Sequence, residues 1–128
     1  VICFESIFSD SVSECVEDGA EVITILSNDS WLGASIPLYQ HHTHSIIRAV
    51  ENRRYVLTST NTGISSVVTP YGKILAETEK NTKSSVSAEF CMMENLSIYA
   101  FTGNIIIIPS CIIILYGSIK TFYRNKRK

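Results

Sequence analysis

The sequence predicts an α/β fold followed by one carboxyl-terminal transmembrane helix. Three observations predict it. Strand-like apolar stretches alternate with helical ones in the first half of the chain. Short β-branched stretches separated by turn residues follow. A nearly uncharged apolar run with basic residues behind it ends the chain. Since part of the 45% hydrophobic content of the 128 residues lies in that run, the rest can build one modest core.

Hydrophobic periodicity and the flanking turn and cap residues place the regular elements. Apolar Leu38, Ile46, Ile47 and Val50 predict an amphipathic helix over residues 37–52, with Pro37 at its first turn. A shorter helix capped by Ser9 or Asp10 is expected to run to about residue 18. Strands are expected at residues 1–3, 21–27, 55–59, 64–69, 74–77 and 86–90, the later ones as a meander.

The apolar run at the end of the chain has the length and flanks of a membrane span. Residues 105–123 carry a single charge, Lys120, and as a helix they would be roughly 28 Å long at about 1.5 Å per residue. A buried core helix is the alternative, and Pro109 lies inside the run. Because basic residues cluster only after the run, the positive-inside rule places residues 124–128 in the cytoplasm and the rest outside. Residues 93–104 are then a juxtamembrane segment.

Charge and cysteine usage exclude several classes of function. The 11 Lys and Arg residues against 12 acidic residues give no basic field for a phosphate backbone, so nucleic acid is not an expected partner. The four cysteines lack metal-ligand or redox spacing. His41, His42 and His44 would splay around a helix instead of converging on one ion, so no metal and no cofactor are expected.

Several short motifs, in order, resemble one enzyme family. Residues 1–6 read Val-Ile-Cys-Phe-Glu-Ser, residues 26–33 read Leu-Ser-Asn-Asp-Ser-Trp-Leu-Gly, and residues 59–65 read Ser-Thr-Asn-Thr-Gly-Ile-Ser. Between and after them stand Gln-His at 40–41, Arg-Ala-Val-Glu at 48–51, Pro-Tyr-Gly-Lys-Ile at 70–74 and Tyr-Ala-Phe-Thr-Gly-Asn at 99–104. This order resembles the nitrilase, or carbon-nitrogen hydrolase, superfamily, and within it the apolipoprotein N-acyltransferases of bacterial inner membranes, where a similar last block precedes a transmembrane helix.

The resemblance implies a fold and a reaction. Residues 1–92 would be the carboxyl-terminal half of a nitrilase-like αββα sandwich, its other half lying upstream in the same enzyme. The reaction would pass a fatty acyl chain from a phospholipid, through a Cys thioester, to the amino-terminal diacylglyceryl-cysteine amine of a lipoprotein. The family's Glu base and Lys precede the nucleophile segment, so this chain alone would be inactive. The cell location implied is the bacterial inner membrane, with the α/β part facing the periplasm or exterior.

Four residues carry this expectation at the site. On the family pattern Cys3 is the nucleophile and Glu5 a supporting acid, while Trp31 and Phe4 would bind substrate. Phe4 stands where the family usually has Tyr, so a phenol hydroxyl is absent. Each has a plainer alternative: Cys3 as a small buried hydrophobe, Glu5 as a solvated carboxylate, and Trp31 as a packing side chain. For the whole chain, the alternatives are a membrane-tethered amidase of the same superfamily and a non-catalytic remnant or anchor.

Overall fold

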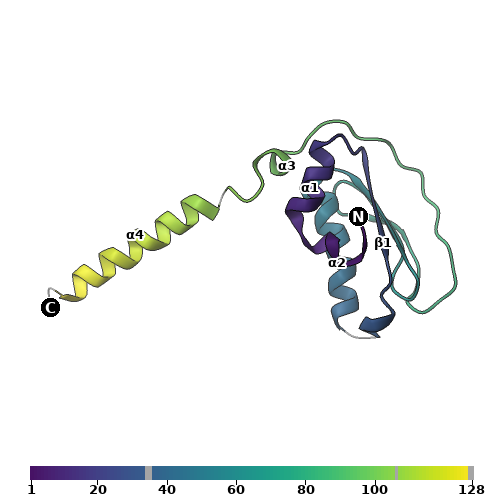
Figure 1. Cartoon of the computed structure of the whole chain (residues 1–128), viewed down its shortest axis with the longest axis horizontal. Coiled ribbons are helices and arrows are strands. Elements are labelled where there is room, and N and C mark those ends of the chain that lie inside the picture. The colour runs from purple at the N-terminus through teal and green to yellow at the C-terminus, as the bar shows by residue number, and fades with distance from the viewer. Residues whose placement is uncertain (34–35, 106, 127–128) are drawn as a thin grey trace.

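The computed structural model describes residues 1–33, 36–105 and 107–126, as an α/β body from which a long carboxyl-terminal helix projects (Figure 1). The elements, in chain order, are the 3-10 turn η1 (Cys3–Ile7), α1 (Ser9–Glu17), β1 (Val22–Ser27), the 3-10 turn η2 (Ser30–Leu32), α2 (Ile36–Asn52), β2 (Tyr55–Thr60), β3 (Ser66–Val68), β4 (Ile74–Glu77), α3 (Ile98–Thr102) and α4 (Ile107–Lys126). The α/β class expected from the sequence is therefore correct.

The four strands form one mixed sheet in the order β1-β2-β3-β4. β1 and β2 are parallel and are joined by helix α2, as a crossover between parallel strands requires. β2, β3 and β4 follow as an antiparallel meander, which confirms the expected one. Ile2 bridges Leu26 in parallel, so the first residues run along the free edge of β1, but Ile2 is 73% exposed and not part of a buried strand.

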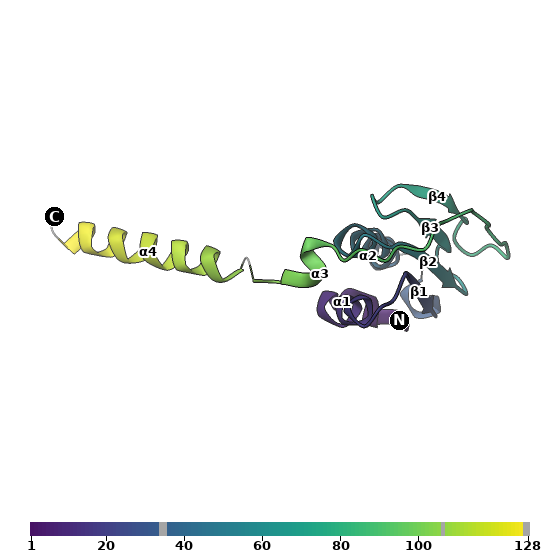
Figure 2. The same ribbon diagram turned by 90° about the horizontal axis from the view of Figure 1, so that it is seen from above.

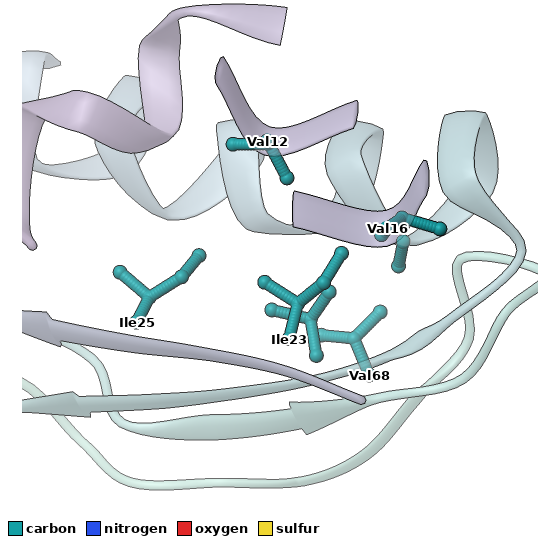
Figure 3. Close-up of a cluster of buried hydrophobic side chains, with 7 residues drawn as sticks. Val12, Val16, Ile23, Ile25 and Val68 are labelled. Carbon is teal, nitrogen blue, oxygen red and sulfur yellow. The ribbon is translucent and has the colours of Figure 1, made fainter. Parts of the chain in front are cut away.

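Helices α1 and α2 cover the same face of this sheet, and the strands lie beside one another when the molecule is viewed from above (Figure 2). Val12 and Val16 of α1 project onto Ile23, Ile25 and Val68 of the sheet (Figure 3). Ala49 and Val56 complete this core. Full burial of a Val or Ile side chain contributes about 1.5 to 3 kcal/mol, so these contacts hold the helical layer on the sheet.

The buried face of α2 differs from the apolar face that the sequence predicts. Leu38 is buried as expected, but Ile47 and Val50 are 38% and 39% exposed. Four polar side chains are buried on this helix instead: His41, Ser45, Arg48 and Asn52. The prediction failed because hydrophobic periodicity counts polar residues as exposed, whereas a polar side chain can be buried when it has hydrogen-bonding partners, as His41 and Ser45 have. Another of the four, Arg48, pairs with Glu51 at 3.0 Å.

Two predicted boundaries are wrong, and so is a second predicted strand, after the one at residues 1–3. Helix α1 is preceded by Phe8 at the N-cap, and neither Ser9 nor Asp10 caps it. The strand expected at residues 64–69 is confined to β3. Residues 86–90 form no strand. They lie extended, with residues 84–86 against the sheet face away from the helices and Phe90 against Tyr55 (ring centroids 5.7 Å apart). Alternating polarity marks an extended chain, and such a chain need not join a ladder.

Arg54 fixes the end of this long segment to the body. Its side chain is 1% exposed and donates three hydrogen bonds across the fold, from Nε to the Ala20 carbonyl (2.8 Å), from Nη1 to the Asn95 carbonyl (2.7 Å) and from Nη2 to the Glu94 carbonyl (3.1 Å). Burial lowers the pKa of the guanidinium, and nearby Glu21 opposes that effect. Arg54 thereby joins three segments that are distant in sequence: the start of β2, the approach to β1 and the approach to α3.

The large apolar side chains of helix α4 are exposed. Ile108, Ile113 and Leu115 are between 60% and 70% exposed, and Tyr116 and Phe122 are similarly open. Within residues 1–33, 36–105 and 107–126, no helix combines the length and the apolar character needed to cross a bilayer. The transmembrane helix expected at residues 105–123 is thus not confirmed. Residue 106 of that span, and residues 127–128 of the expected basic tail, lie outside the described part of the chain.

We expect Arg54→Met to lower the free energy of unfolding by about 2 to 4 kcal/mol, because three hydrogen bonds from a buried guanidinium to distant carbonyl groups are lost. The matched control is Arg53→Met. Arg53 is exposed and lies over the Tyr71 ring at 5.2 Å, an interaction that contributes about 0.5 to 1 kcal/mol. Urea unfolding followed by circular dichroism measures both. Equal losses in the two variants would show that the Arg54 hydrogen bonds do not secure the fold.

Candidate functional site

Cys3 lies at a sharp turn where the extended first residues enter η1. Its φ angle is +51°, a left-handed conformation that a non-glycine residue adopts at a cost of about 1 to 3 kcal/mol. The side chain is half-buried, and its sulfur lies 3.4 Å from Ser27 Oγ. Residues 2–5 are called the nucleophile turn below, after the role that the family resemblance implies for Cys3.

Glu5 closes this turn from within. Its carboxylate accepts a hydrogen bond from the Ile2 N–H at 2.8 Å, while the Glu5 N–H donates to the Ile2 carbonyl at 3.1 Å. The Glu5 side chain is otherwise exposed. The expected supporting acid is thus adjacent to Cys3 and has a definite contact, which is to the backbone of the nucleophile turn.

Phe4 and Trp31, the two expected substrate-binding residues, lie against each other. Their ring centroids are 5.2 Å apart, and Phe4 also stacks on the His41 ring at 5.3 Å with an interplanar angle of 15°. Trp31 is 64% exposed and Phe4 40%, whereas His41 is buried. The three rings form a row that runs from exposed Trp31, through Phe4, which follows Cys3 in the chain, to buried His41.

Behind the nucleophile turn, a buried carboxylate connects four segments. Asp29 is 3% exposed and accepts hydrogen bonds from Ser27 Oγ and from His41 Nδ1, the latter at 3.0 Å. His41 Nε2 lies 3.2 Å from Ser6 Oγ and 3.3 Å from the Cys3 carbonyl oxygen. The chain of contacts therefore runs from the end of β1, through helix α2, to the backbone of the nucleophile turn.

The turn between β2 and β3 completes the surroundings of Asp29. The Asp29 N–H donates to Asn61 Oδ1 at 3.1 Å, and Asn61 Nδ2 donates to Asn28 Oδ1 at 2.7 Å. Gly63 lies directly against the carboxylate, because a Cβ atom there would overlap Asp29 Oδ2 and lie 3.0 Å from Thr60 Oγ1. A glycine is needed at residue 63 because Asp29 approaches it so closely.

An open depression of about 510 Å³ lies beside the nucleophile turn. Cys3, Leu26 and Ser27 form one side, and Ser59, Thr60 and Asn61 the other. The depression lies at the carboxyl ends of the parallel strands β1 and β2, which is where ligands bind in α/β sheets.

In the described part of the chain, the sulfur of Cys3 has a hydroxyl, that of Ser27, as its side-chain neighbour. A hydroxyl is a poor base at neutral pH, so deprotonation of the thiol requires a general base from elsewhere.

Burial also affects the neighbouring histidines of α2, His42 and His44. His42 Nε2 lies 3.6 Å from Glu77 of β4, and burial lowers the pKa of His42, with the Glu77 carboxylate opposing that effect. Burial, together with Arg48, also lowers the pKa of His44. Among residues 1–33, 36–105 and 107–126, no three His, Cys, Asp or Glu side chains are grouped so that they could hold a metal ion.

Sequence reasoning missed the inner half of this site. Ser6, Ser27, Asp29 and His41 were not proposed as functional residues, although all four lie inside quoted motifs. One available signal was the spacing of Leu38, His41 and Ser45, which places His41 on the buried side of the helix. A buried histidine needs a partner for each ring nitrogen, and the polar end of the preceding strand supplies one of them.

We expect Gly63→Ala to lower the free energy of unfolding by about 1 to 3 kcal/mol, since the added methyl group must displace Asp29. Gly117→Ala is the matched control, because a Cβ atom there meets open space in α4. Urea unfolding measures the cost, and alkylation of Cys3 reports whether the nucleophile turn has moved. Wild-type stability in Gly63→Ala would contradict the tight packing of Asp29 against this turn.

This chain is similar in sequence to several known proteins. The chain is 32% identical to the apolipoprotein N-acyltransferase of Haemophilus influenzae over 126 residues, which are 98% of this chain and 24% of that protein. It is 33% identical to the apolipoprotein N-acyltransferase of Gloeobacter violaceus over 118 residues, 92% of this chain and 22% of that protein. The chain thus spans about a quarter of the length of these relatives.

Two solved structures share the fold. Saccharomyces cerevisiae Nit3, a member of the nitrilase superfamily, aligns with a TM-score of 0.50 and 26% identity over 64% of this chain and 33% of its own. The C. elegans NitFhit protein aligns with a TM-score of 0.51 and 24% identity over 62% of this chain and 21% of its own, which shows the fold alone. The carbon-nitrogen hydrolase family model matches residues 1–93. This chain therefore belongs to the carbon-nitrogen hydrolase family.

Proposed function

We propose that this chain is part of an apolipoprotein N-acyltransferase. In the proposed reaction Cys3 takes a fatty acyl chain from a phospholipid as a thioester and passes it to the amino-terminal amine of a diacylglyceryl-cysteine lipoprotein. The observation that carries the proposal is the extent of the similarity. Relatives bearing this name match up to 98% of the chain, and so include α3 and α4, whereas the two nitrilase-fold structures cover 62% and 64%.

The geometry around Cys3 suits the acyl-enzyme step. A thiol is intrinsically nucleophilic, and Cys3 lies in a strained turn at the rim of an open depression. The exposed rings of Trp31 and Phe4 offer an apolar surface beside it, of the kind that an acyl chain or the edge of a lipid headgroup would contact. Glu5 serves the reaction by closing the turn that presents the thiol.

The chain by itself would be an incomplete catalyst. The hydroxyl of Ser27 cannot serve as the general base, and the family pattern has its Glu base and a Lys upstream of the nucleophile segment. We therefore infer that the upstream half of the enzyme supplies these groups and covers the sheet face opposite the helices. This inference agrees with the share of the relatives' length that the chain spans, about a quarter.

We propose further that residues 105–123 attach the chain to the bacterial inner membrane. The α/β body would face the periplasm or exterior, and the basic end of α4 the cytoplasm. The support is the exposed apolar surface of α4, together with Ile98 and Phe101 of α3, which are 84% and 82% exposed. Lys120, Arg124 and Lys126 add positive charge at one end only. An acyl donor dissolved in the bilayer would then lie within reach of the α/β body.

Acylation of Cys3 tests the proposed reaction. Membranes holding this chain, with and without its upstream half, are incubated with phospholipid carrying a labelled acyl chain. We expect a hydroxylamine-labile label on Cys3 only when the upstream half is present, and none in Cys3→Ala, because the thioester needs both the thiol and a base. Cys15→Ala is the matched control, since that exposed thiol lies on α1.

Other outcomes would favour other functions. A thioester that is hydrolysed by water but not passed to a lipoprotein amine would indicate a membrane-tethered amidase. No label with either preparation, in a folded protein, would contradict the acyltransferase and leave a non-catalytic remnant or anchor. Label on both Cys3 and Cys15 would show unselective acylation.

Membrane attachment has its own test. We expect the full chain to remain with the membrane in alkaline carbonate, and residues 1–104 to be released, because the apolar side chains of α4 favour the hydrocarbon interior. Labelling of Cys111 with a membrane-impermeant maleimide, against Cys91 as the control, tests whether the middle of α4 is shielded by lipid. Release of the full chain by carbonate would rule out an integral attachment.

A further inference from the structure

We propose that His41, held by Asp29, is a positioning residue that fixes the peptide group following the nucleophile. It acts on the carbonyl of Cys3 and, through the planar peptide, on the N–H of Phe4. This proposal rests on the proposed function insofar as Cys3 is the residue that becomes acylated. His41 itself touches neither the reacting sulfur nor the acyl group.

The His41 ring is held on both edges and on one face. Nδ1 lies 3.0 Å from the Asp29 carboxylate, and Nε2 lies 3.2 Å from Ser6 Oγ and 3.3 Å from the Cys3 carbonyl oxygen. Phe4 stacks on the ring, and the ring is 6% exposed. A side chain restrained in this way cannot turn without breaking at least one of these contacts, so its orientation is fixed.

The hydrogen bonds around Ser6 indicate what His41 does there. The Ser6 hydroxyl has one hydrogen, and the hydroxyl donates to the Cys3 carbonyl at 3.0 Å. An Nε2 atom without a hydrogen would compete with that carbonyl for the same donor. A hydrogen on Nε2 instead pairs a donor with an acceptor in both of its contacts, with Ser6 Oγ and with the Cys3 carbonyl. The network thus assigns His41 as a second donor to Cys3.

Two hydrogen bonds to the Cys3 carbonyl also fix the direction of the next backbone group, the Phe4 N–H. The peptide between Cys3 and Phe4 is planar and trans, so its N–H points opposite to its C=O. A carbonyl held toward His41 therefore directs the Phe4 N–H away from the network. A backbone N–H fixed beside a nucleophile can hold the negative oxygen that forms when a thiolate attacks an ester carbonyl. The left-handed φ of Cys3 is maintained by the same contacts.

Two reactions of Cys3 separate this role from simple packing. With p-nitrophenyl acetate, the sulfur bonds to the carbonyl carbon and the carbonyl oxygen takes up the electron pair. Collapse then expels p-nitrophenolate and leaves an acetyl thioester, and the thiol proton passes to the buffer. With iodoacetamide, the sulfur displaces iodide and no oxyanion forms. A fixed Phe4 N–H should therefore assist acylation and not alkylation.

The matched variants are His41→Asn and His41→Gln in the full chain, kept in solution by a mild detergent. The amide nitrogen of Gln reaches about as far as Nε2 and can still donate to Cys3 and Ser6. The shorter Asn reaches only the Nδ1 position, toward Asp29. We expect His41→Asn to slow acylation of Cys3 at least about tenfold, with alkylation changed by less than about threefold, and His41→Gln to retain most of the acylation rate. Mass spectrometry of the peptides gives both rates, with exposed Cys15 as the internal reference.

The acylation and alkylation rates of His41→Asn can overturn the proposal in two ways. Equal slowing of acylation and alkylation in His41→Asn would show only a packing role, and wild-type acylation in that variant would show none. Should His41→Asn fail to fold, Ser6→Ala removes the other donor to the Cys3 carbonyl, and it should also slow acylation without slowing alkylation. Equal effects on both reactions would again contradict the positioning role.

A second measurement separates failure of this proposal from failure of the proposed function. If wild-type Cys3 in this chain alone is acylated no faster than Cys15, the proposed function is judged by the phospholipid label obtained with the upstream half present, because that half would supply the base. The carbonyl ¹³C chemical shift of Cys3 then still tests His41, because that shift reports the hydrogen bonds that the carbonyl accepts. Similar shifts in wild type and His41→Gln, with a different one in His41→Asn, support the positioning role. Identical shifts in all three proteins overturn it.

Discussion

The burial of one carboxylate, that of Asp29, is the constraint on which the site depends. A buried charge is tolerated only when its partners surround it, and here they come from separate parts of the chain. Ser27 and His41 donate to the side chain, Asn61 accepts from the backbone N–H, and Gly63 leaves room beside it. The end of β1, helix α2 and the turn after β2 must therefore all be in place before Asp29 can be buried at acceptable cost. The nucleophile turn is attached to the same network through His41.

This dependence explains how a strained residue can persist at the surface. The left-handed backbone of Cys3 is unfavourable for an L-residue, so the surrounding contacts must over-determine it. Glu5 closes the turn from the solvent side, and Ser6 and His41 hold the Cys3 carbonyl from the inside. The thiol is thereby presented by a backbone that the interior defines, while the sulfur itself stays at the rim of the depression. Fold stability and site geometry are two effects of one set of hydrogen bonds.

The sequence predicted the parts of the molecule that depend on local pattern. Alternation and turn residues placed β1, β2, β4 and the helix α2, and ordered motifs placed Cys3, Phe4, Glu5 and Trp31 near one another. The long-range polar contacts could not be predicted from the sequence. The residues around Asp29 in the sequence do not show whether its carboxylate is buried or exposed in a loop. In the same way, the sequence does not distinguish buried Arg54 from exposed Arg53, because the difference lies in the hydrogen bonds of Arg54 to the carbonyls of residues 94 and 95. The strand predicted at residues 86–90 was wrong for the opposite reason. The alternating pattern correctly indicates an extended chain, but these residues do not pair with a strand of the described sheet.

The hydrogen bonds of Arg54 also decide which part of the chain is free to change in length. Thr78 and Asn81 are tied back to Ser65 and Thr62, and the far end of the segment is held at residues 94 and 95. Residues 82–89 thus form a loop whose two ends are fixed independently of its contour. Lengthening such a loop costs free energy that grows only with the logarithm of its length. Insertions there would move neither the site nor the point at which the chain leaves the α/β body toward α4. We therefore expect related chains to differ in length in this loop, and a tag can be inserted there.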